Sequence, residues 1–233
     1  EAFDAWPSHD AGTRPPGLPD PPAGGRARLA IVPRERAAQS ELRIGHLVTG
    51  RNTPDYPALL VMNAVLGGQF VSRVNLKLRE EKGYTYGART SFDWRRGATP
   101  FSLQASVQTA VTVEAVRDAL AELEAIRGPR PPDAHELALA KASLTRGYPR
   151  HFETCQQVAR AVAQLALYDL PDTYFEEFVP TVNAVTGDEV VAAARRHLDP
   201  DRLTTLIVGD HPAVEPALAT LGLGSARVLP QEI

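Results

Sequence analysis

Residues 67–87 read GGQFVSRVNLKLREEKGYTYG, and this stretch determines how the chain is interpreted. Two glycines open it, and glycine commonly ends helices because it adopts backbone conformations that other residues avoid. Four apolar residues then recur at helical spacing: Phe70, Val71, Val74 and Leu78. We therefore predict one amphipathic helix from Gln69 to about Glu81, ended by Gly83 and followed directly by a strand.

The residues that follow alternate as strands do. From Tyr84 to Trp94 the apolar residues fall on even positions, which places Tyr86 on the apolar face. From Phe101 to Val107 apolar residues alternate with serine and glutamine, so one face is expected to meet a core and the other to meet water. Further strands are predicted at residues 29–32, 40–49, 202–208 and 226–229, with His46 as a hydrogen-bonded core residue.

Helical patterns fill the rest of the chain, near residues 53–66, 112–127, 153–169, 172–184 and 211–221. Asp133 and Thr186 each precede a glutamate by three residues, the pattern of a capping box at a helix start. Strands and helices come in blocks and do not alternate as βαβ units. We therefore predict an α+β fold, an antiparallel sheet with helices packed on one face.

The composition of the chain limits the classes of partner and function that we expect. The chain has 233 residues, 43% of them hydrophobic, and a net charge of -3. This balance gives no reason to expect a nucleic-acid or anionic-membrane partner. No apolar run approaches the roughly 20 residues of a membrane span. The single cysteine, Cys155, excludes an intrachain disulfide and is expected to be a small buried side chain.

We divide the chain into two parts. Residues 1–26 are rich in proline and glycine, which predicts a linker arriving from an upstream domain. Residues 27–233 are predicted to form one domain. The chain starts with Glu1, which suggests a fragment or a processed product, so its N-terminus gives no compartment.

Metal-binding motifs are missing. None of the six histidines stands four residues from another with a glutamate between them, and no distant set suggests three ligands. The serine-hydrolase and P-loop signatures are absent as well. We therefore expect no catalytic zinc in this chain.

The segment from Leu78 to Tyr86, with the neighbouring residues 72–75 and 106–109, resembles the insulinase/pitrilysin-type zinc peptidases, whose metal motif is an inverted His-x-x-Glu-His. It is most similar to the zinc-lacking Arg/Tyr partner subunit of bacterial members. The resemblance extends over about residues 28–210 and implies the processing-peptidase-like metallohydrolase fold. It also implies that Arg79 and Tyr86 are the arginine and tyrosine that this half contributes, in trans, to substrate and transition-state binding.

The resemblance implies a non-catalytic, substrate-binding half of a zinc metallopeptidase, inactive alone. Its partners would be a peptide substrate and a zinc-bearing homologous subunit or upstream domain, with a homodimer as another possibility. No cofactor is expected in this chain, because the zinc would be carried by the partner. The compartment stays open between the bacterial cytoplasm and periplasm.

Two alternatives remain. The chain could be the C-terminal half of a single-chain active peptidase whose zinc motif lies upstream, or an inert assembly subunit of the same fold. Without the resemblance, Arg79 and Tyr86 would be ordinary surface or packing residues. Four other arginines are expected to be solvated at the surface: Arg73, Arg89, Arg95 and Arg96.

Overall fold

The computed structural model describes residues 28–230, and the predicted 1–26 linker lies outside this range. Six strands form one sheet in the order β3-β4-β2-β5-β1-β6. Their bounds are β1 Leu29–Pro33, β2 Gln39–Val48, β3 Thr85–Phe92, β4 Thr99–Gln108, β5 Thr204–Gly209 and β6 Arg227–Val228. The helices are α1 Tyr56–Leu66, α2 Arg73–Asn75, α3 Thr112–Ala125, α4 Ala134–Thr145, α5 Cys155–Tyr168, α6 Tyr174–Ala184, α7 Gly187–His197 and α8 His211–Leu218. Short helical turns add η1 Leu76–Glu81, η2 Thr109–Val111, η3 Tyr148–Phe152, η4 Pro200–Arg202 and η5 Ala219–Leu221.

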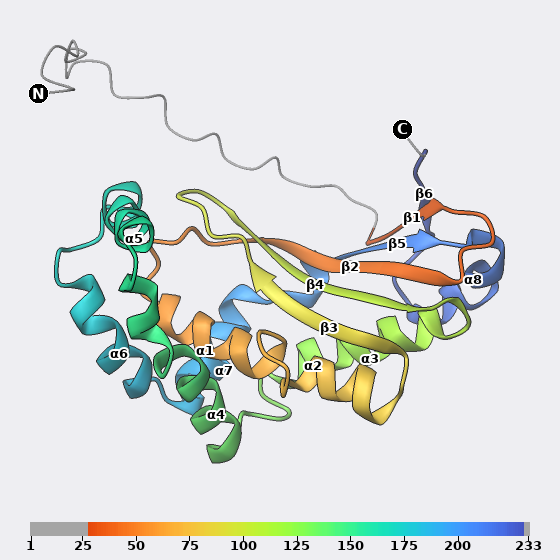
Figure 1. Cartoon of the computed structure of the whole chain (residues 1–233). Coiled ribbons are helices and arrows are strands. Elements are labelled where there is room, and N and C mark those ends of the chain that lie inside the picture. The colour runs from red at the N-terminus through yellow and green to blue at the C-terminus, as the bar shows by residue number, and fades with distance from the viewer. Residues whose placement is uncertain (1–27, 231–233) are drawn as a thin grey trace, which may run out of the picture.

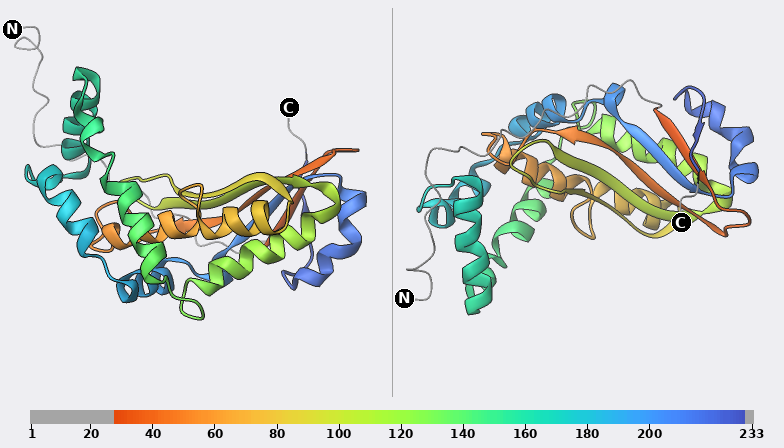
Figure 2. Two further views of the ribbon diagram at one scale, coloured as in Figure 1. Left: turned by 60° about the horizontal axis from the view of Figure 1, so that its bottom comes forward. Right: turned by 90° about the horizontal axis from the view of Figure 1, so that it is seen from above.

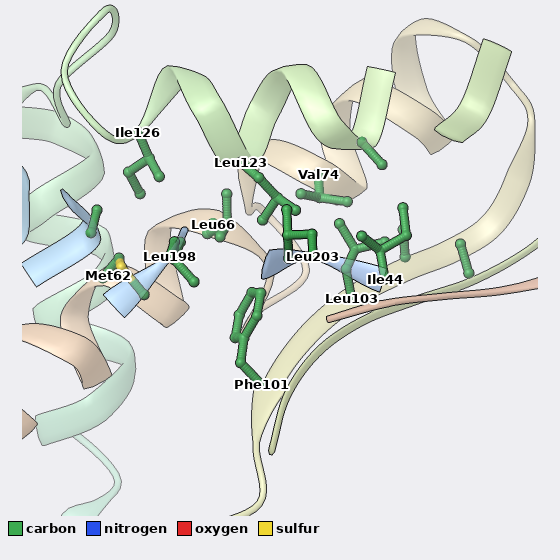
Figure 3. Close-up of a cluster of buried hydrophobic side chains, with 14 of the residues drawn as sticks. Ile44, Met62, Leu66, Val74, Phe101, Leu103, Leu123, Ile126, Leu198 and Leu203 are labelled. Carbon is green, nitrogen blue, oxygen red and sulfur yellow. The ribbon is translucent and has the colours of Figure 1, made fainter. Parts of the chain in front are cut away.

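The α+β prediction is confirmed: helices α1, α2, α3 and α7 lie against one face of the sheet (Figure 1). Seen from above, the strands lie in front of these helices (Figure 2). Strands β2 and β4 pair over ten residues and bury every second side chain of β4, as the alternation predicted. Figure 3 shows Leu103 and Phe101 from β4 meeting Leu66 of α1 and Leu123 of α3.

The sheet is mixed rather than wholly antiparallel. Pairs β2–β4, β2–β5 and β3–β4 are antiparallel, but β1 runs parallel to both β5 and β6. Strand β5 lies between the consecutive strands β1 and β2, antiparallel to β2 and parallel to β1. Helix α8 connects β5 to β6 and returns the chain to the starting end of the sheet, so β6 runs in the same direction as β5, and parallel strands need such a crossover connection.

A buried arginine joins the sheet to the α5 and α6 region. The Arg51 guanidinium carbon lies 3.1 Å from the ring centroid of Tyr56 and 5.3 Å from that of Tyr174, and it donates a hydrogen bond to the Tyr174 hydroxyl at 2.6 Å. The Tyr168 hydroxyl, at the end of α5, donates to the Trp94 carbonyl at 3.0 Å. Burial raises the pKa of Tyr56 well above its usual value, so the phenol under the cation stays neutral.

The predicted helix over residues 69–81 begins later than expected. The backbone of Ser72 is extended, and the helix starts at Arg73. The Asn75 side chain binds the Phe70 carbonyl at 2.7 Å, a local bond that competes with helical pairing in residues 69–72. Phe70 and Val71 are therefore exposed, whereas Val74 and Leu78 are buried as predicted.

Arg73 corrects a second expectation, because it is buried and not solvated. Its side chain makes two 2.6 Å hydrogen bonds to the Glu136 carboxylate and further bonds to the carbonyls of Arg130 and Pro131 at 2.7 and 3.0 Å. Glu136 also completes the predicted capping box of α4 with Asp133. This ion pair fixes α2 against the start of α4.

Removing this arginine is expected to be costly. Arg73→Ala leaves the Arg130 and Pro131 carbonyls and the partly buried Glu136 carboxylate without their donor, so the free energy of unfolding should fall by about 2–3 kcal/mol. Urea denaturation measures this. The control is Arg89→Ala, an exposed arginine on β3, which should change stability by less than about 0.5 kcal/mol. Equal effects of the two variants would contradict the buried-pair argument.

The pair should also make stability depend on pH. Burial alone would raise the pKa of Glu136, but the hydrogen bonds from Arg73 and the Asp133 backbone outweigh it and hold that pKa below its usual value. A carboxyl with a depressed folded-state pKa contributes stability above its unfolded-state pKa and loses it as the pH falls through the folded-state value. The acid-induced loss of stability should therefore be smaller in Arg73→Ala than in the unchanged chain, measured as the unfolding free energy against pH.

Candidate functional site

Arg79 lies in η1, a π-helical turn that continues α2. The Lys82 amide donates to the carbonyl five residues back, at Lys77, and π-turns of this kind are rare and often found at functional sites. Gly83 then adopts a left-handed backbone, φ 65°, which favours glycine. The amides of Gly83 and Tyr84 close the helix end on the carbonyls of Arg79 and Leu78 at 3.1 and 2.8 Å. The end of the helix is thus tied rigidly to the start of β3.

The Arg79 side chain is about one third exposed. Its guanidinium carbon lies 4.5 Å from the centroid of the Phe70 ring, a cation–π contact, and its Nε is 3.5 Å from the Glu80 carboxylate. Phe70 itself is 62% exposed. The guanidinium is therefore in contact with an aromatic ring and still open to solvent.

Tyr86 lies on β3, an edge strand of the sheet, and is 90% exposed. Thr85 pairs with Val107 and Ala88 with Ala105, so β3 spends three residue steps where β4 spends two, and the extra residue forms a β-bulge. The bulge moves Tyr86 off the apolar face on which the alternation had placed it. Within the bulge, the Thr85 hydroxyl and the Gly87 backbone exchange hydrogen bonds of 2.9 and 3.1 Å.

Asn75 holds these pieces together. Its side chain is almost fully buried, donates to the Phe70 carbonyl at 2.7 Å and accepts from the Ala88 amide at 3.0 Å. One amide group therefore connects the segment that braces Arg79 with the bulge that carries Tyr86. The sequence pattern assigned Phe70 to the apolar stripe of a helix and assigned Asn75 no role; the one available signal at Asn75 was a poor helix former among good ones.

Arg79 and Tyr86 thus lie on the two arms of the turn at Gly83, both accessible to solvent. Among the described residues no hydrogen bond joins the guanidinium to the phenol. The arrangement leaves each group free to meet a third molecule, and Arg79 supplies a planar fork of donors while Tyr86 supplies a hydroxyl.

The uncovered face of the sheet continues from the bulge as a polar surface. A hollow of about 280 Å³ adjoins Gly87 and is lined by polar side chains that include Glu41, Arg43, Arg89 and Gln104. Arg89 donates to Gln104 at 3.1 Å, and Arg43 lies 3.3 Å from Glu41. The Arg89–Gln104 pair joins β3 to β4, whereas Arg43 and Glu41 are neighbours on one face of β2, so these polar side chains are held in place by one another.

The described residues hold no group of three or more histidine, cysteine or acidic side chains that could bind a metal ion. The side chains of residues 28–230 therefore do not fit a catalytic zinc ion. Cys155 is exposed, contrary to the buried position expected for it, because it opens α5, most of whose residues face solvent. Within residues 28–230, every helix is too short or too polar to cross a bilayer.

Asn75→Ala should loosen the whole turn. The variant leaves the Ala88 amide and the Phe70 carbonyl without their partner, which should lower the free energy of unfolding by about 1–3 kcal/mol. Hydrogen exchange at the Ala88 amide should become much faster. Asn183→Ala, which truncates an exposed asparagine at the end of α6, is the matched control. Unchanged exchange at Ala88 would show that Asn75 does not hold the bulge.

Comparison with known proteins assigns this chain to a family. The family described as "Peptidase M16 inactive domain" matches residues 1–144, more than half of the chain. A Mycobacterium tuberculosis protein named an uncharacterized zinc protease is 27% identical over 209 residues, which cover 90% of this chain and 44% of that protein. The chain thus spans less than half the length of the curated relatives it matches.

Solved structures share the fold. A peptidase M16 inactive domain from Pseudomonas fluorescens superposes with a TM-score of 0.72 at 24% identity, covering 78% of this chain and 43% of that one. A chain of complex III2 from Candida albicans gives a TM-score of 0.67 at 14% identity, covering 83% and 48%. Together with the match over residues 1–144, these results show that the chain belongs to the family of peptidase M16 inactive domains.

Proposed function

We propose that this domain is the non-catalytic, substrate-binding half of a zinc metallopeptidase, and that Arg79 and Tyr86 are its contribution to a composite active site. The observation that carries the proposal is their placement. Both groups are open to solvent on the two arms of one rigid turn, beside the edge strand β3. A peptide can meet this edge in an extended conformation, because an edge strand leaves backbone donors and acceptors unpaired.

In this proposal a companion domain supplies the zinc and with it Lewis-acid activation of the scissile carbonyl. The residues of this chain hold the substrate. The Arg79 guanidinium, which contacts the Phe70 ring, donates to peptide carbonyl oxygens. The Tyr86 hydroxyl donates to the oxygen that gains negative charge as the carbonyl is attacked. Donors of this kind stabilise the transition state most when they are fixed in advance, and the Gly83 turn and Asn75 provide that rigidity.

The origin of the companion domain separates two versions of the proposal. In one, a homologous subunit carries the zinc, as a heterodimer. In the other, the zinc motif lies upstream in the same polypeptide. The second version is favoured by one observation: relatives named zinc proteases are more than twice as long as the segment that this chain matches.

The test is peptide cleavage by this domain together with its zinc-bearing companion. Arg79→Ala is expected to lower kcat/KM about 100-fold, and Tyr86→Phe between about 10- and 100-fold, because each removes one transition-state donor. Arg117→Ala removes an exposed arginine of α3, on the helix-covered side of the sheet, and is the matched control that should retain activity. Zinc content of the assembly should be the same in all variants.

A binding measurement separates this role from that of an inert assembly subunit, a role compatible with the shared fold of the complex III2 chain. Fluorescence anisotropy of a labelled extended peptide should show weaker binding to Arg79→Ala than to the unchanged domain. Full activity of both Arg79→Ala and Tyr86→Phe in the assembled enzyme would refute the composite site.

A further inference from the structure

Beyond the bulge, the outer edge of β3 is already occupied by groups of this chain. The Ala88 amide donates to the Asn75 side chain and the Thr90 amide donates to the Gly67 carbonyl, both at 3.0 Å. A peptide that joins an edge as an added strand needs such amides as its donors. An extended peptide that meets the bulge at Tyr86 therefore cannot continue as a paired strand and must pass over one face of the sheet.

The uncovered face of the sheet is the one available to this peptide, because helices pack on the other (Figure 1). Gly87 lines the hollow of about 280 Å³ on the uncovered face and has no side chain to obstruct a chain that crosses β3. The hollow therefore lies next to the bulge, on the path of a peptide that leaves Tyr86 toward the interior of this face.

Two arginines and one glutamate carry the charge of the hollow. The Glu41 carboxylate uses both of its oxygens, because one accepts from the Ser106 hydroxyl and the other lies 3.3 Å from Arg43. Arg43 also donates to the Leu42 carbonyl at 2.9 Å. Glu41 and Arg43 therefore neutralise each other, which leaves Arg89 as the lining cation without an anionic partner in the hollow.

Arg89 is exposed, as the sequence predicted, and its guanidinium makes one hydrogen bond within residues 28–230, to the Gln104 side chain at 3.1 Å. None of the ion pairs within that range includes Arg89. The Gln104 amide is itself oriented, because its nitrogen donates to the Ser102 hydroxyl at 3.1 Å. A guanidinium has five N–H donors, so Arg89 keeps most of its donors for a ligand.

We propose that Arg89 forms a subsite for an acidic side chain of the peptide, so that the preferred substrates carry an aspartate or glutamate about three residues from the scissile bond. The inference rests on the proposed function and names its substrate class. The carboxylate of that residue enters the hollow and pairs with the Arg89 guanidinium, whose planar fork of donors matches the two carboxylate oxygens.

The position of the acidic residue follows from the length of the strand. Tyr86 and Arg89 are three residues apart, which corresponds to roughly 10 Å along β3. An extended peptide advances about 3.3 Å per residue. A peptide whose scissile carbonyl meets Tyr86 therefore brings its third residue from that bond to Arg89. Both chain directions give the same distance, so the third residue on each side of the bond is tested.

A basic peptide side chain fits the same hollow less well. Its partner would be Glu41, whose two oxygens already accept from Ser106 and lie beside Arg43. An ammonium group in the hollow would also face the like charge of Arg89. The hollow therefore discriminates in favour of a carboxylate by attraction and against an ammonium by repulsion.

The experiment measures cleavage of quenched fluorescent peptides by the full chain together with its zinc-bearing companion. The peptides are identical except at the third residue on one side of the bond or the other, which is glutamate, its neutral isostere glutamine, or lysine. At one of the two positions, kcat/KM for the glutamate peptide is expected to exceed that for the glutamine peptide about tenfold, because the pair adds one charge-assisted hydrogen bond.

Arg89→Gln should remove the difference between the glutamate and glutamine peptides, and Arg89→Glu should reverse the preference toward lysine. Faster cleavage of the lysine peptide requires a folded enzyme, so misfolding cannot produce this result. Arg117→Glu is the matched control: it makes the same change in net charge at an exposed arginine of α3 and should keep the acidic preference.

The inference is overturned if the glutamate and glutamine peptides are cleaved equally at both positions, or if Arg117→Glu changes the preference as much as Arg89→Glu does. Cleavage that still depends on Arg79 and Tyr86 would then leave the proposed function standing without this subsite. Conversely, full activity of Arg79→Ala and Tyr86→Phe would refute the composite site and this subsite with it.

Discussion

The central pair of strands, β2 and β4, sets the main constraint on this molecule, because one face of each strand is apolar and must be buried while the other is polar and must stay exposed to water. Leu42, Ile44, Leu103 and Val107 are fully buried, whereas the residues that alternate with this face are polar: Glu41, Arg43, Gln104 and Ser106. A helix packed on the polar face would bury charges without partners, which is far costlier than leaving them hydrated. The helices therefore pack on one side of the sheet, and the other side remains an uncovered polar face next to the edge strand β3.

The features that distinguish the candidate site lie at the edge of this uncovered polar face. The edge strand has no neighbour on one side, so it can accept an extra residue at Tyr86 without disturbing the pairing of the central strands. Gly83 turns the chain there, and Asn75 fixes both arms of the turn from within. The core thus supplies a rigid base, and the departures from regular structure, the π-turn and the bulge, place Arg79 and Tyr86 at the solvent boundary.

The sequence predicts what depends on local pattern and misses what depends on distant partners. The alternation in β4, the capping boxes at Asp133 and Thr186 and the glycine stop at Gly83 all follow from neighbouring residues, and the structure contains them. The burial of Arg73 could not be predicted, because Glu136 stands 63 residues away. The bulge was equally hidden, since the sequence of β3 alternates without interruption and only its register with β4 shows the extra residue. The roles of Arg79 and Tyr86 came from family resemblance and not from their spacing.

The exposure of Tyr86 bears directly on whether this domain can act alone. In water two unit charges 4 Å apart interact by only about 1 kcal/mol, and a hydrogen bond to a solvated phenol gains little over one to water. A phenol that is 90% exposed and an arginine that is one third exposed can stabilise a developing negative charge strongly only when a second surface excludes solvent from them. This chain fixes the backbone that carries both donors, but it does not supply the dry environment. The proposed role therefore requires a companion that closes over the uncovered polar face of the sheet. The same companion can bring the metal, because residues 28–230 hold no group of three side chains that could bind one.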